Sequence, residues 1–201
     1  MNKEPIIVAI HCFVYNHEPY LRDCLNGFAM QQTDFRFVAI VHDDVSTDES
    51  AAIIREYADK YPNIIKPIFE TENQWSKHDG SLDRIMNDAI AATGAKYVAM
   101  CEGDDYWIDP NKLQKQVDYL EAHPNCTCYA HNSLTLNTKS RAIGLFNNKI
   151  LDTADYPLDT FLTNGWFTPT ASLLYRRSDY QQFDDMQGFM HGDYSLLITF
   201  Y

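Results

Sequence analysis

The chain has 201 residues, which is enough for one α/β domain with a sizeable buried core. Hydrophobic residues make up 45% and charged residues 22%, so disorder is excluded as the main state. The net charge of −12 argues against nucleic acid as a partner and against unaided binding to an anionic membrane. A phosphate-bearing ligand would therefore need local help, which a divalent cation held by carboxylates supplies.

The cysteines and the N-terminal residues indicate in which cellular compartment the protein is expected. The five cysteines are odd in number, and Cys126-Thr-Cys128 lacks the CxxC spacing of a zinc ribbon or redox pair. Composition favours reduced cysteines in the core of a cytoplasmic protein. The first residues show neither a signal-peptide pattern nor an apolar run of membrane-spanning length. We therefore expect a cytoplasmic domain without an integral membrane segment.

Strand-like apolar runs alternate with helix-like periodic stretches, which predicts a mainly parallel sheet built from βαβ units. The expected strands are 6–13, 37–41, 64–69, 97–101, 127–131 and 170–175. The expected helices are 19–30, one that runs to Tyr61 after the capping residues 46–50, 82–92, and one opened by Asp109-Pro110 and closed near His123. Residues 70–80 are polar and predict a loop, and the pattern weakens after Asn137.

The division of the chain follows from the same pattern. We expect one domain over 1–201, with 1–131 as its ligand-binding part and 132–201 as a second, less regular part. An apolar run opens at His191 and has no cap, glycine or proline before Tyr201. We therefore expect the natural domain to continue beyond this chain.

Two acidic pairs follow directly after predicted strands, Asp43-Asp44 and Asp104-Asp105. In open parallel sheets, ligands bind in the crevice outside the carboxyl ends of the strands. Four carboxylates gathered there repel one another unless a positive charge lies between them. Mg²⁺ or Mn²⁺, which prefer oxygen ligands, would meet that need through one or two carboxylates and leave other positions for diphosphate oxygens. The alternative is that each pair only terminates a strand and caps a helix.

Three motifs in this order resemble those of family-2 glycosyltransferases. They are Val14-Tyr15-Asn16 after the first strand, Asp43-Asp44-Val-Ser-Thr-Asp48 after the second, and Glu102-Gly-Asp-Asp-Tyr-Trp107 after the fourth. The later stretch His191-Gly-Asp193-Tyr resembles the segment that bears the catalytic base in this family. The resemblance implies a GT-A fold, a Rossmann-like three-layer sandwich around a mainly parallel sheet.

The resemblance also implies roles for single residues. Val14 and Tyr15 would lie against the base of a nucleotide-sugar donor, and Asp44 would accept its ring N–H. Asp104 would approach the ribose or diphosphate, Asp105 would bind Mn²⁺ or Mg²⁺, and Asp193 would be the general base. The physical reading agrees, because a base must reach the attacking hydroxyl while a metal neutralises the departing diphosphate.

Two departures and three weaker candidates accompany these roles. Glu102 stands where the family usually carries an aspartate of the metal-binding motif, and His11-Cys12-Phe13 replaces a more usual Ile-Pro-Thr-like strand end. Arg84 lies in the region where relatives place groups that face the donor. The alternative is that Arg84 lies on a solvated face of its helix. Trp75 and Lys77 in the preceding loop would cover the diphosphate, with a mobile loop as the alternative.

The sequence therefore predicts an inverting, metal-dependent transferase that moves a sugar from a nucleotide-diphosphate donor to a glycan or lipid-linked acceptor. UDP is the expected nucleotide because it is the family's commonest. A lipid-linked acceptor would place the longer protein at the inner face of a membrane. The alternatives are a sugar nucleotidyltransferase, which the lack of a glycine-rich basic first loop disfavours, and a non-catalytic binding module. The chain contains neither a Gly-x-Gly-x-x-Gly motif nor a Walker sequence, so dinucleotide oxidoreductases and P-loop NTPases are disfavoured.

Overall fold

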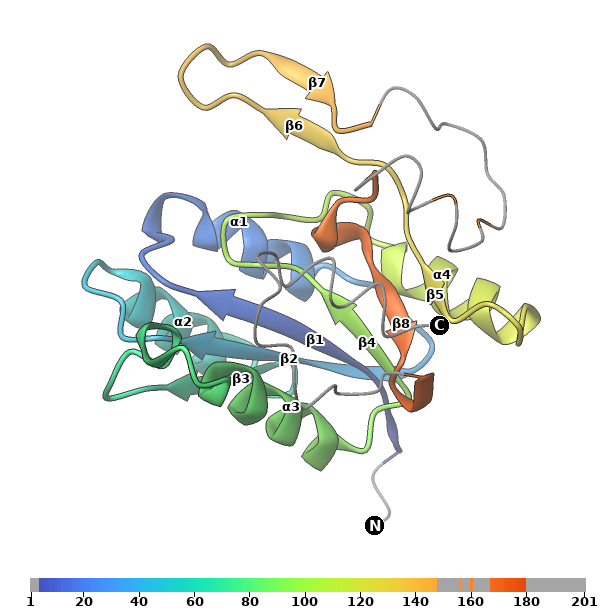
Figure 1. Ribbon diagram of the computed structural model, residues 1–201, viewed down its shortest axis with the longest axis horizontal. Helices are drawn as coiled ribbons and strands as arrows, with labels where there is room; N and C mark the ends of the chain where they lie inside the picture. Colours follow the sequence, from blue (N-terminus) through green and yellow to red (C-terminus); the bar gives the residue numbers. More distant parts are fainter. Residues whose placement is uncertain (1–3, 148–155, 157–159, 161–166, 180–201) are drawn as a thin grey trace.

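The chain forms a six-stranded sheet between two helical layers (Figure 1), and the computed structural model describes residues 4–147, 156, 160 and 167–179. The strand order is β3-β2-β1-β4-β8-β5. The four strands β1 (Ile6–Val14), β2 (Arg36–Asp43), β3 (Ile65–Phe69) and β4 (Tyr97–Met100) pair in parallel. Strand β8 (Leu174–Arg176) pairs antiparallel with both β4 and β5 (Cys128–Tyr129), so β5 runs in the same direction as the first four. The prediction of an α/β fold with a mainly parallel sheet is confirmed.

Helices cover both faces of the sheet because alternate strand residues on both faces are apolar. Helix α3 (Ser81–Thr93) packs on one face, where Met86 and Ile90 meet Ala9 of β1. The other face is covered by α1 (Glu18–Ala29), α2 (Ser50–Lys60) and α4 (Lys112–Ala122). All four helices lie where the sequence predicts them, within two or three residues at either end.

The predicted strand over 170–175 is wrong in its first half. Thr170–Ser172 forms a 3-10 turn, η2, and only Leu174–Arg176 pairs with β4, before a second turn, η3 (Arg177–Asp179). The cause is local, because the Ser172 hydroxyl and its backbone N–H both donate to the carbonyl of Pro169, at 2.6 and 2.9 Å. Such side-chain bonds to the backbone compete with strand pairing.

The start of α4 and the extent of β5 also differ from expectation. Asp109 closes a tight turn, because its side chain accepts the N–H of Asn111 and its backbone carbonyl accepts the N–H of Lys112. Helix α4 therefore begins after this turn and not at Pro110. The strand expected over 127–131 shortens to Cys128–Tyr129.

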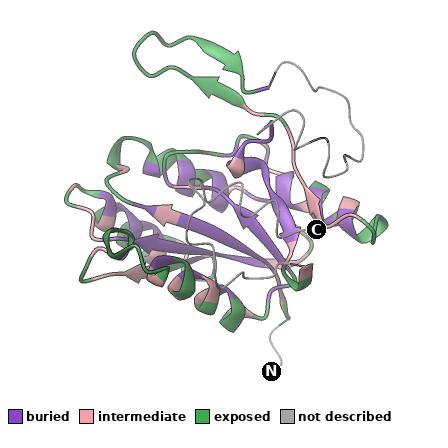
Figure 2. Cartoon of the chain, in the orientation of Figure 1, coloured by how far each residue is buried: buried purple, intermediate pink, exposed green. Residues whose placement is uncertain are grey.

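A two-stranded antiparallel hairpin is formed by β6 (Leu134–Leu136), just before the region where the sequence pattern weakens, and β7 (Ile143–Leu145), within that region. Figure 1 shows it projecting from the body of the molecule, and Figure 2 shows that its residues are exposed. This hairpin was not predicted from the sequence. Across residues 4–147 and 167–179, no helix has the length and apolar character needed to cross a bilayer.

Trp107 joins three parts of the chain below the carboxyl edge of the sheet. Gly27 of α1 lies against its backbone so closely that a Cβ on Gly27 would be 2.9 Å from the Trp107 nitrogen. Its indole N–H donates to the carbonyl of Ala171 at 2.8 Å, and its ring packs edge-on against Phe28. Trp107 is buried, as expected for a packing residue.

A buried lysine lies beside this tryptophan. The ammonium of Lys112 is 4.1 Å from the Trp107 ring centroid and donates to the side-chain oxygen of Gln116 at 2.7 Å. Gln116 in turn donates to the carbonyl of Ser172 at 2.7 Å. Burial lowers the pKa of Lys112 to about 7. The cluster therefore ties α4 to the turn before β8.

The lowered pKa of Lys112 predicts a pH dependence of stability. Between about pH 7 and pH 10.5 the unfolded chain holds a proton on this lysine that the folded chain has released. The free energy of unfolding should therefore rise with pH in this window, by at most about 1.4 kcal/mol per pH unit. Denaturant unfolding of the wild type and of Lys112→Met at pH 7 and pH 9 should show the advantage of the wild type growing with pH. The exposed Lys115→Met on the same helix is the control, and a Lys112→Met difference as flat as that of the control would contradict the prediction.

Candidate functional site

Three loops meet at the carboxyl edge of the sheet, after β1, β2 and β4. Backbone bonds join them, because the N–H of Gly103 donates to the carbonyl of Phe13 and the N–H of Asp44 to that of Val14, each at 3.0 Å. The pairing of β1 with its two neighbours thus continues past the ends of the strands. This brings the motifs of Tyr15, Asp44 and Asp104 into one place.

Gly103 allows the acidic loop after β4 to lie directly on β1 and the start of α1. A Cβ on Gly103 would be 2.7 Å from Nδ1 of His17 and 2.9 Å from Cγ2 of Val14. Both distances are shorter than carbon contacts allow, so glycine is required by space rather than by backbone conformation. The glycine between Glu102 and Asp104 thereby sets the position of both acidic residues.

Two buried thiols contact backbone carbonyls of the same loop from its core side. Sγ of Cys24 lies 3.4 Å from the carbonyl oxygen of Glu102, and Sγ of Cys101 lies 3.6 Å from that of Asp105. Burial raises the pKa of the Cys24 thiol, so it stays protonated and can donate. All five cysteines are free thiols, as the sequence predicts.

Asp104 and Asp105 are open to solvent at the mouth of the site. Partial burial of its carboxyl raises the pKa of Asp105, the charge of Asp104 raises it further, and His17 opposes both effects. A carboxyl group in this setting would be stabilised in its charged form by a cation. His17 was not predicted for the site, because a lone histidine before a helix gives no signal until the fold brings its charge near Asp105.

Asp44 is buried and holds the loop after β3. Its two carboxylate oxygens accept the backbone N–H groups of Gln74 and Trp75 at 2.6 and 3.0 Å, and its carbonyl accepts the side chain of Asn73 at 3.0 Å. The loop expected over 70–80 therefore contains a short 3-10 turn, η1 (Trp75–Lys77), anchored at the site. Trp75 itself is 69% exposed.

A second set of contacts fixes Gln74 in the same loop. Its side-chain nitrogen donates to Glu70 at 3.1 Å, and the other carboxylate oxygen of Glu70 lies 3.1 Å from Nε2 of the fully buried His42. His42 occupies a buried position of β2, where an apolar residue is the more usual choice. No sequence pattern links His42, at the end of β2, with Glu70, which follows β3.

The turn Ser46-Thr47-Asp48 interlocks with the start of α1. Asn16 donates its N–H to the Ser46 hydroxyl at 2.9 Å, and its side-chain oxygen accepts the N–H of Thr47 at 2.7 Å. Asp48 accepts the N–H groups of Glu18, in α1, and Ser50, in α2, each at 3.0 Å. The predicted capping residues therefore serve both helices, since the carboxylate of Asp48 bridges the two N-terminal ends.

The backbone turns sharply at two places in these loops. Asn16 and Val45 have left-handed conformations, with φ of 56° and 64°. Asparagine tolerates this region, whereas a β-branched residue is rarely found there. Each turn follows the last residues of a strand and redirects the chain across the edge of the sheet.

The two aspartates of the first acidic pair differ in how far backbone N–H groups satisfy them. Asp44 is satisfied by backbone N–H groups, and one oxygen of Asp43 accepts the N–H of Ser46 at 3.3 Å, while its other oxygen is buried without a partner among the described residues. Within those residues, no three His, Cys, Asp or Glu side chains are grouped so that they could hold a metal ion. A cation at this edge would thus depend on the second pair and on oxygens of its ligand.

The remaining predicted residues lie in different settings. Val14 is buried at the end of β1, and Tyr15 after it is half exposed. Arg84 turns back to the loop before its own helix and donates to the carbonyl of Asp79 at 2.7 Å, so among the described residues its partner is Asp79 and not the acidic loop. Asp193 lies outside the described residues.

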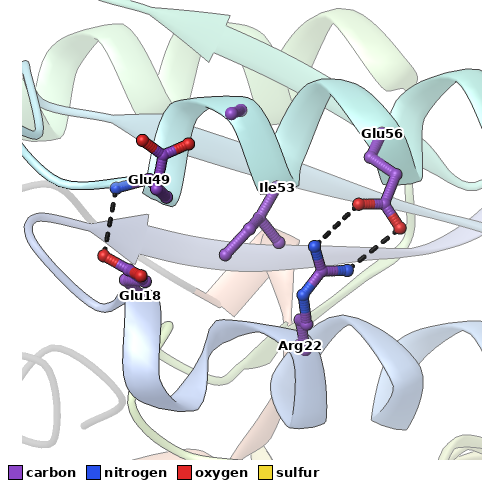
Figure 3. A pocket seen from close by; sticks show the side chains of 6 residues that line it. Glu18, Arg22, Glu49, Ile53 and Glu56 are labelled. Atoms are coloured by element: carbon purple, nitrogen blue, oxygen red, sulfur yellow. Dashed lines mark hydrogen bonds and ion pairs between the residues drawn. The ribbon is translucent and has the colours of Figure 1, made fainter.

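A hollow of about 430 Å³ lies away from these residues, between the outer sides of α1 and α2 (Figure 3). Arg22 and Glu56 face each other across it in a two-bond ion pair at 2.9 and 2.8 Å. Both side chains are about half exposed, and such pairs contribute little to stability, about 0–1 kcal/mol. No residue predicted for the site lines this hollow.

The close contact at Gly103 predicts a large effect of one methyl group. Gly103→Ala should lower the free energy of unfolding by about 1–3 kcal/mol, because His17 and Val14 must move to admit the Cβ. Chemical denaturation checks this, with Asp104→Ala in the same loop as the control, since Asp104 is exposed. Equal stabilities of the Gly103→Ala variant and the wild type would show that the loop has room to spare.

Comparisons with known proteins agree with this geometry. The model of the family described as "Glycosyl transferase family 2" matches residues 10–183. An uncharacterized protein of Mycobacterium tuberculosis is 37% identical over 86% of this chain and 47% of its own length. An uncharacterized glycosyltransferase of a Nostoc species is 30% identical over 81% of this chain and 48% of its own length. The chain thus spans about half the length of these curated relatives.

Solved structures share the fold at low sequence identity. Residues 1–349 of TarS from S. aureus superpose with a TM-score of 0.57 at 18% identity, covering 98% of this chain and 55% of that one. The mannosyltransferase PcManGT from Pyrobaculum calidifontis, in complex with GDP-Man and Mn²⁺, superposes with a TM-score of 0.50 at 22% identity. The match covers 65% of this chain and 36% of that one. The predicted GT-A fold is therefore confirmed. The family match, which spans all three loops of the site, shows that the chain belongs to glycosyl transferase family 2.

Proposed function

We propose that this chain binds the donor and carries the catalytic base of an inverting transferase that uses a UDP-sugar and a hydroxyl of a glycan or lipid-linked acceptor. The observation that carries the proposal is the meeting of three loops at one sheet edge. There, exposed Tyr15 and buried Asp44 lie beside a loop that presents Asp104 and Asp105 to solvent. Residues 1–131 would form the donor side, and 132–201 the acceptor side.

The nucleotide base would lie against Val14 and Tyr15. Asp44 is already an acceptor for two backbone N–H groups, and a carboxylate has about four lone-pair sites, so it retains capacity for a ring N–H of the base. The loop that Asp44 anchors carries the exposed ring of Trp75, which would cover the donor from the other side. Arg84 would reach the donor only after leaving Asp79.

Asp105, with Glu102 as a second ligand, would hold Mn²⁺ or Mg²⁺, and Asp104 would face the ribose or diphosphate. The setting suits a cation, because Asp105 is a carboxylate whose charged form is disfavoured by burial and by its neighbour. Oxygen ligands from one or two carboxylates are typical of these ions. A cation held there would stabilise the charge of the leaving nucleoside diphosphate.

Transfer would need one more group, for which we propose Asp193. Its carboxylate would take the proton of the acceptor hydroxyl while that oxygen forms a bond to the anomeric carbon. The bond from this carbon to the diphosphate oxygen would break on the opposite face, so the configuration would invert. The need for a base at the acceptor side supports this assignment.

Structural neighbours support the choice of nucleotide and metal. A TarS structure in complex with UDP superposes with a TM-score of 0.54 at 20% identity, and the PcManGT complex contains Mn²⁺. A poly(ribitol-phosphate) beta-glucosyltransferase of Bacillus spizizenii is 32% identical over 46% of this chain and 14% of its own length. UDP and Mn²⁺ are therefore the first ligands to test.

Calorimetric titration of UDP into the chain with Mn²⁺ should give binding that is weakened by roughly tenfold or more in Asp105→Ala, because the metal loses a ligand. GDP serves as the nucleotide control, and Asp23→Ala, an exposed aspartate of α1, as the control variant. Equal affinity with and without Mn²⁺ in a folded wild type would contradict the metal assignment.

Asp193→Asn should reduce sugar transfer by about 10²–10⁴-fold while UDP binds with nearly unchanged affinity, because a general base acts on the acceptor and not on the donor. A coupled assay of UDP release with a panel of UDP-sugars and acceptors measures the rate, and Asp179→Asn is the control. Persistent transfer in the variant would rule out Asp193 as the base. A wild type that binds UDP but transfers no sugar in the panel would favour the non-catalytic binding module.

A further inference from the structure

The hairpin of β6 and β7 has one apolar face. Direct cross-strand partners lie on the same side of a sheet, and the pairs are Leu134 with Leu145 and Leu136 with Ile143. All four side chains are exposed, at 58, 53, 40 and 69%. Thr135 and Gly144 form the pair on the opposite face, so the hairpin is amphipathic. Four exposed aliphatic side chains on one projecting element form a patch that water solvates poorly.

The tip of this hairpin is basic and has a defined shape. Lys139 and Arg141 both lie in the connection between the strands. The side-chain oxygen of Asn137 accepts the N–H groups of Lys139 and Ser140 at 3.0 and 2.8 Å, and its carbonyl accepts that of Arg141 at 2.8 Å. The two cations are therefore presented together from a closed turn beside the apolar face.

Charge is distributed unevenly along the chain. No Asp or Glu occurs between Glu121 and Asp152, and this stretch carries a charge of +3 from Lys139, Arg141 and Lys149. The rest of the chain then carries −15, since the net charge is −12. An overall charge of this sign argues against an anionic surface as a partner, but the projecting hairpin has the opposite sign and is the part that extends furthest from the body (Figure 1).

Apolar side chains next to lysine and arginine match the two layers of an anionic bilayer surface. The aliphatic groups enter the boundary of the acyl chains, and the cations bind the headgroups. A second copy of the chain would offer another apolar face, but its hairpin contains no Asp or Glu and so would give Lys139 and Arg141 no anionic partner. We propose that the β6–β7 hairpin is a membrane-docking element that binds anionic phospholipid headgroups through Lys139 and Arg141 and inserts Leu134, Leu136, Ile143 and Leu145. The inference does not depend on the proposed transfer reaction.

Co-sedimentation of the full chain with vesicles tests the proposal without donor or acceptor. We expect binding to vesicles of phosphatidylcholine mixed with phosphatidylglycerol, weaker binding to phosphatidylcholine alone, and loss of the difference at high salt. Lys139→Gln with Arg141→Gln should weaken binding roughly 30-fold, at about fivefold for each basic residue. Leu136→Ser with Ile143→Ser should weaken it at low and high salt alike, because this contribution is not electrostatic.

The matched control is Arg55→Gln with Lys60→Gln on α2, which removes the same two residue types and should leave vesicle binding unchanged. Thermal unfolding of each variant verifies the fold, since every substituted side chain is exposed. Lack of wild-type binding, or equal weakening by the control, would overturn the proposal. So would a concentration-dependent dimer in sedimentation velocity that Leu136→Ser with Ile143→Ser abolishes, because the face would then belong to a second copy.

Discussion

The close approach of the acidic loop to β1 determines where every other part of the site can lie. The bond from Gly103 to Phe13 and the lack of room for a Cβ fix the loop against the first strand and His17. The thiols of Cys24 and Cys101 hold the same loop from the core side. Without this contact, Asp105 would have no fixed relation to Tyr15 or Asp44, and the edge of the sheet would present separate loops.

The sequence was a good guide to whatever is periodic or local. The parallel strands and four helices were predictable because apolar spacing records burial, and Asp44 and Asp105 were predictable as strand-end acids. The contact of Asp44 with the loop after β3 was not, because it joins residues thirty positions apart through backbone N–H groups. The role of His17 was not predictable for the same reason. The turn η2 was mistaken for strand because the Ser172 hydroxyl donates to the carbonyl of Pro169. The hairpin has strands of three residues, too short for a periodic signal.

The aspartates of the two acidic motifs fall into two groups with different structural roles. Asp44 and Asp48 are consumed largely by backbone N–H groups and build the loops around them. Asp104 and Asp105 remain at the surface, where their charges act on each other. A pair of acids in sequence therefore does not indicate a ligand by itself. The number of backbone N–H groups that each carboxylate accepts shows how far it is used to hold the loops in place.

The left-handed turn at Val45 carries a conformational penalty, because a β-branched residue is disfavoured there. A glycine there would relieve a conformational penalty of about 1–2 kcal/mol, and the bonds on either side, from Asp44 to Val14 and from Ser46 to Asp43, hold the valine against it. A valine whose two neighbours are hydrogen-bonded has few other backbone conformations available, whereas a glycine at the same position would have many. The valine thus costs folding free energy while it restricts the loop to few conformations, and a ligand that bound there would meet a loop whose ordering entropy has already been lost.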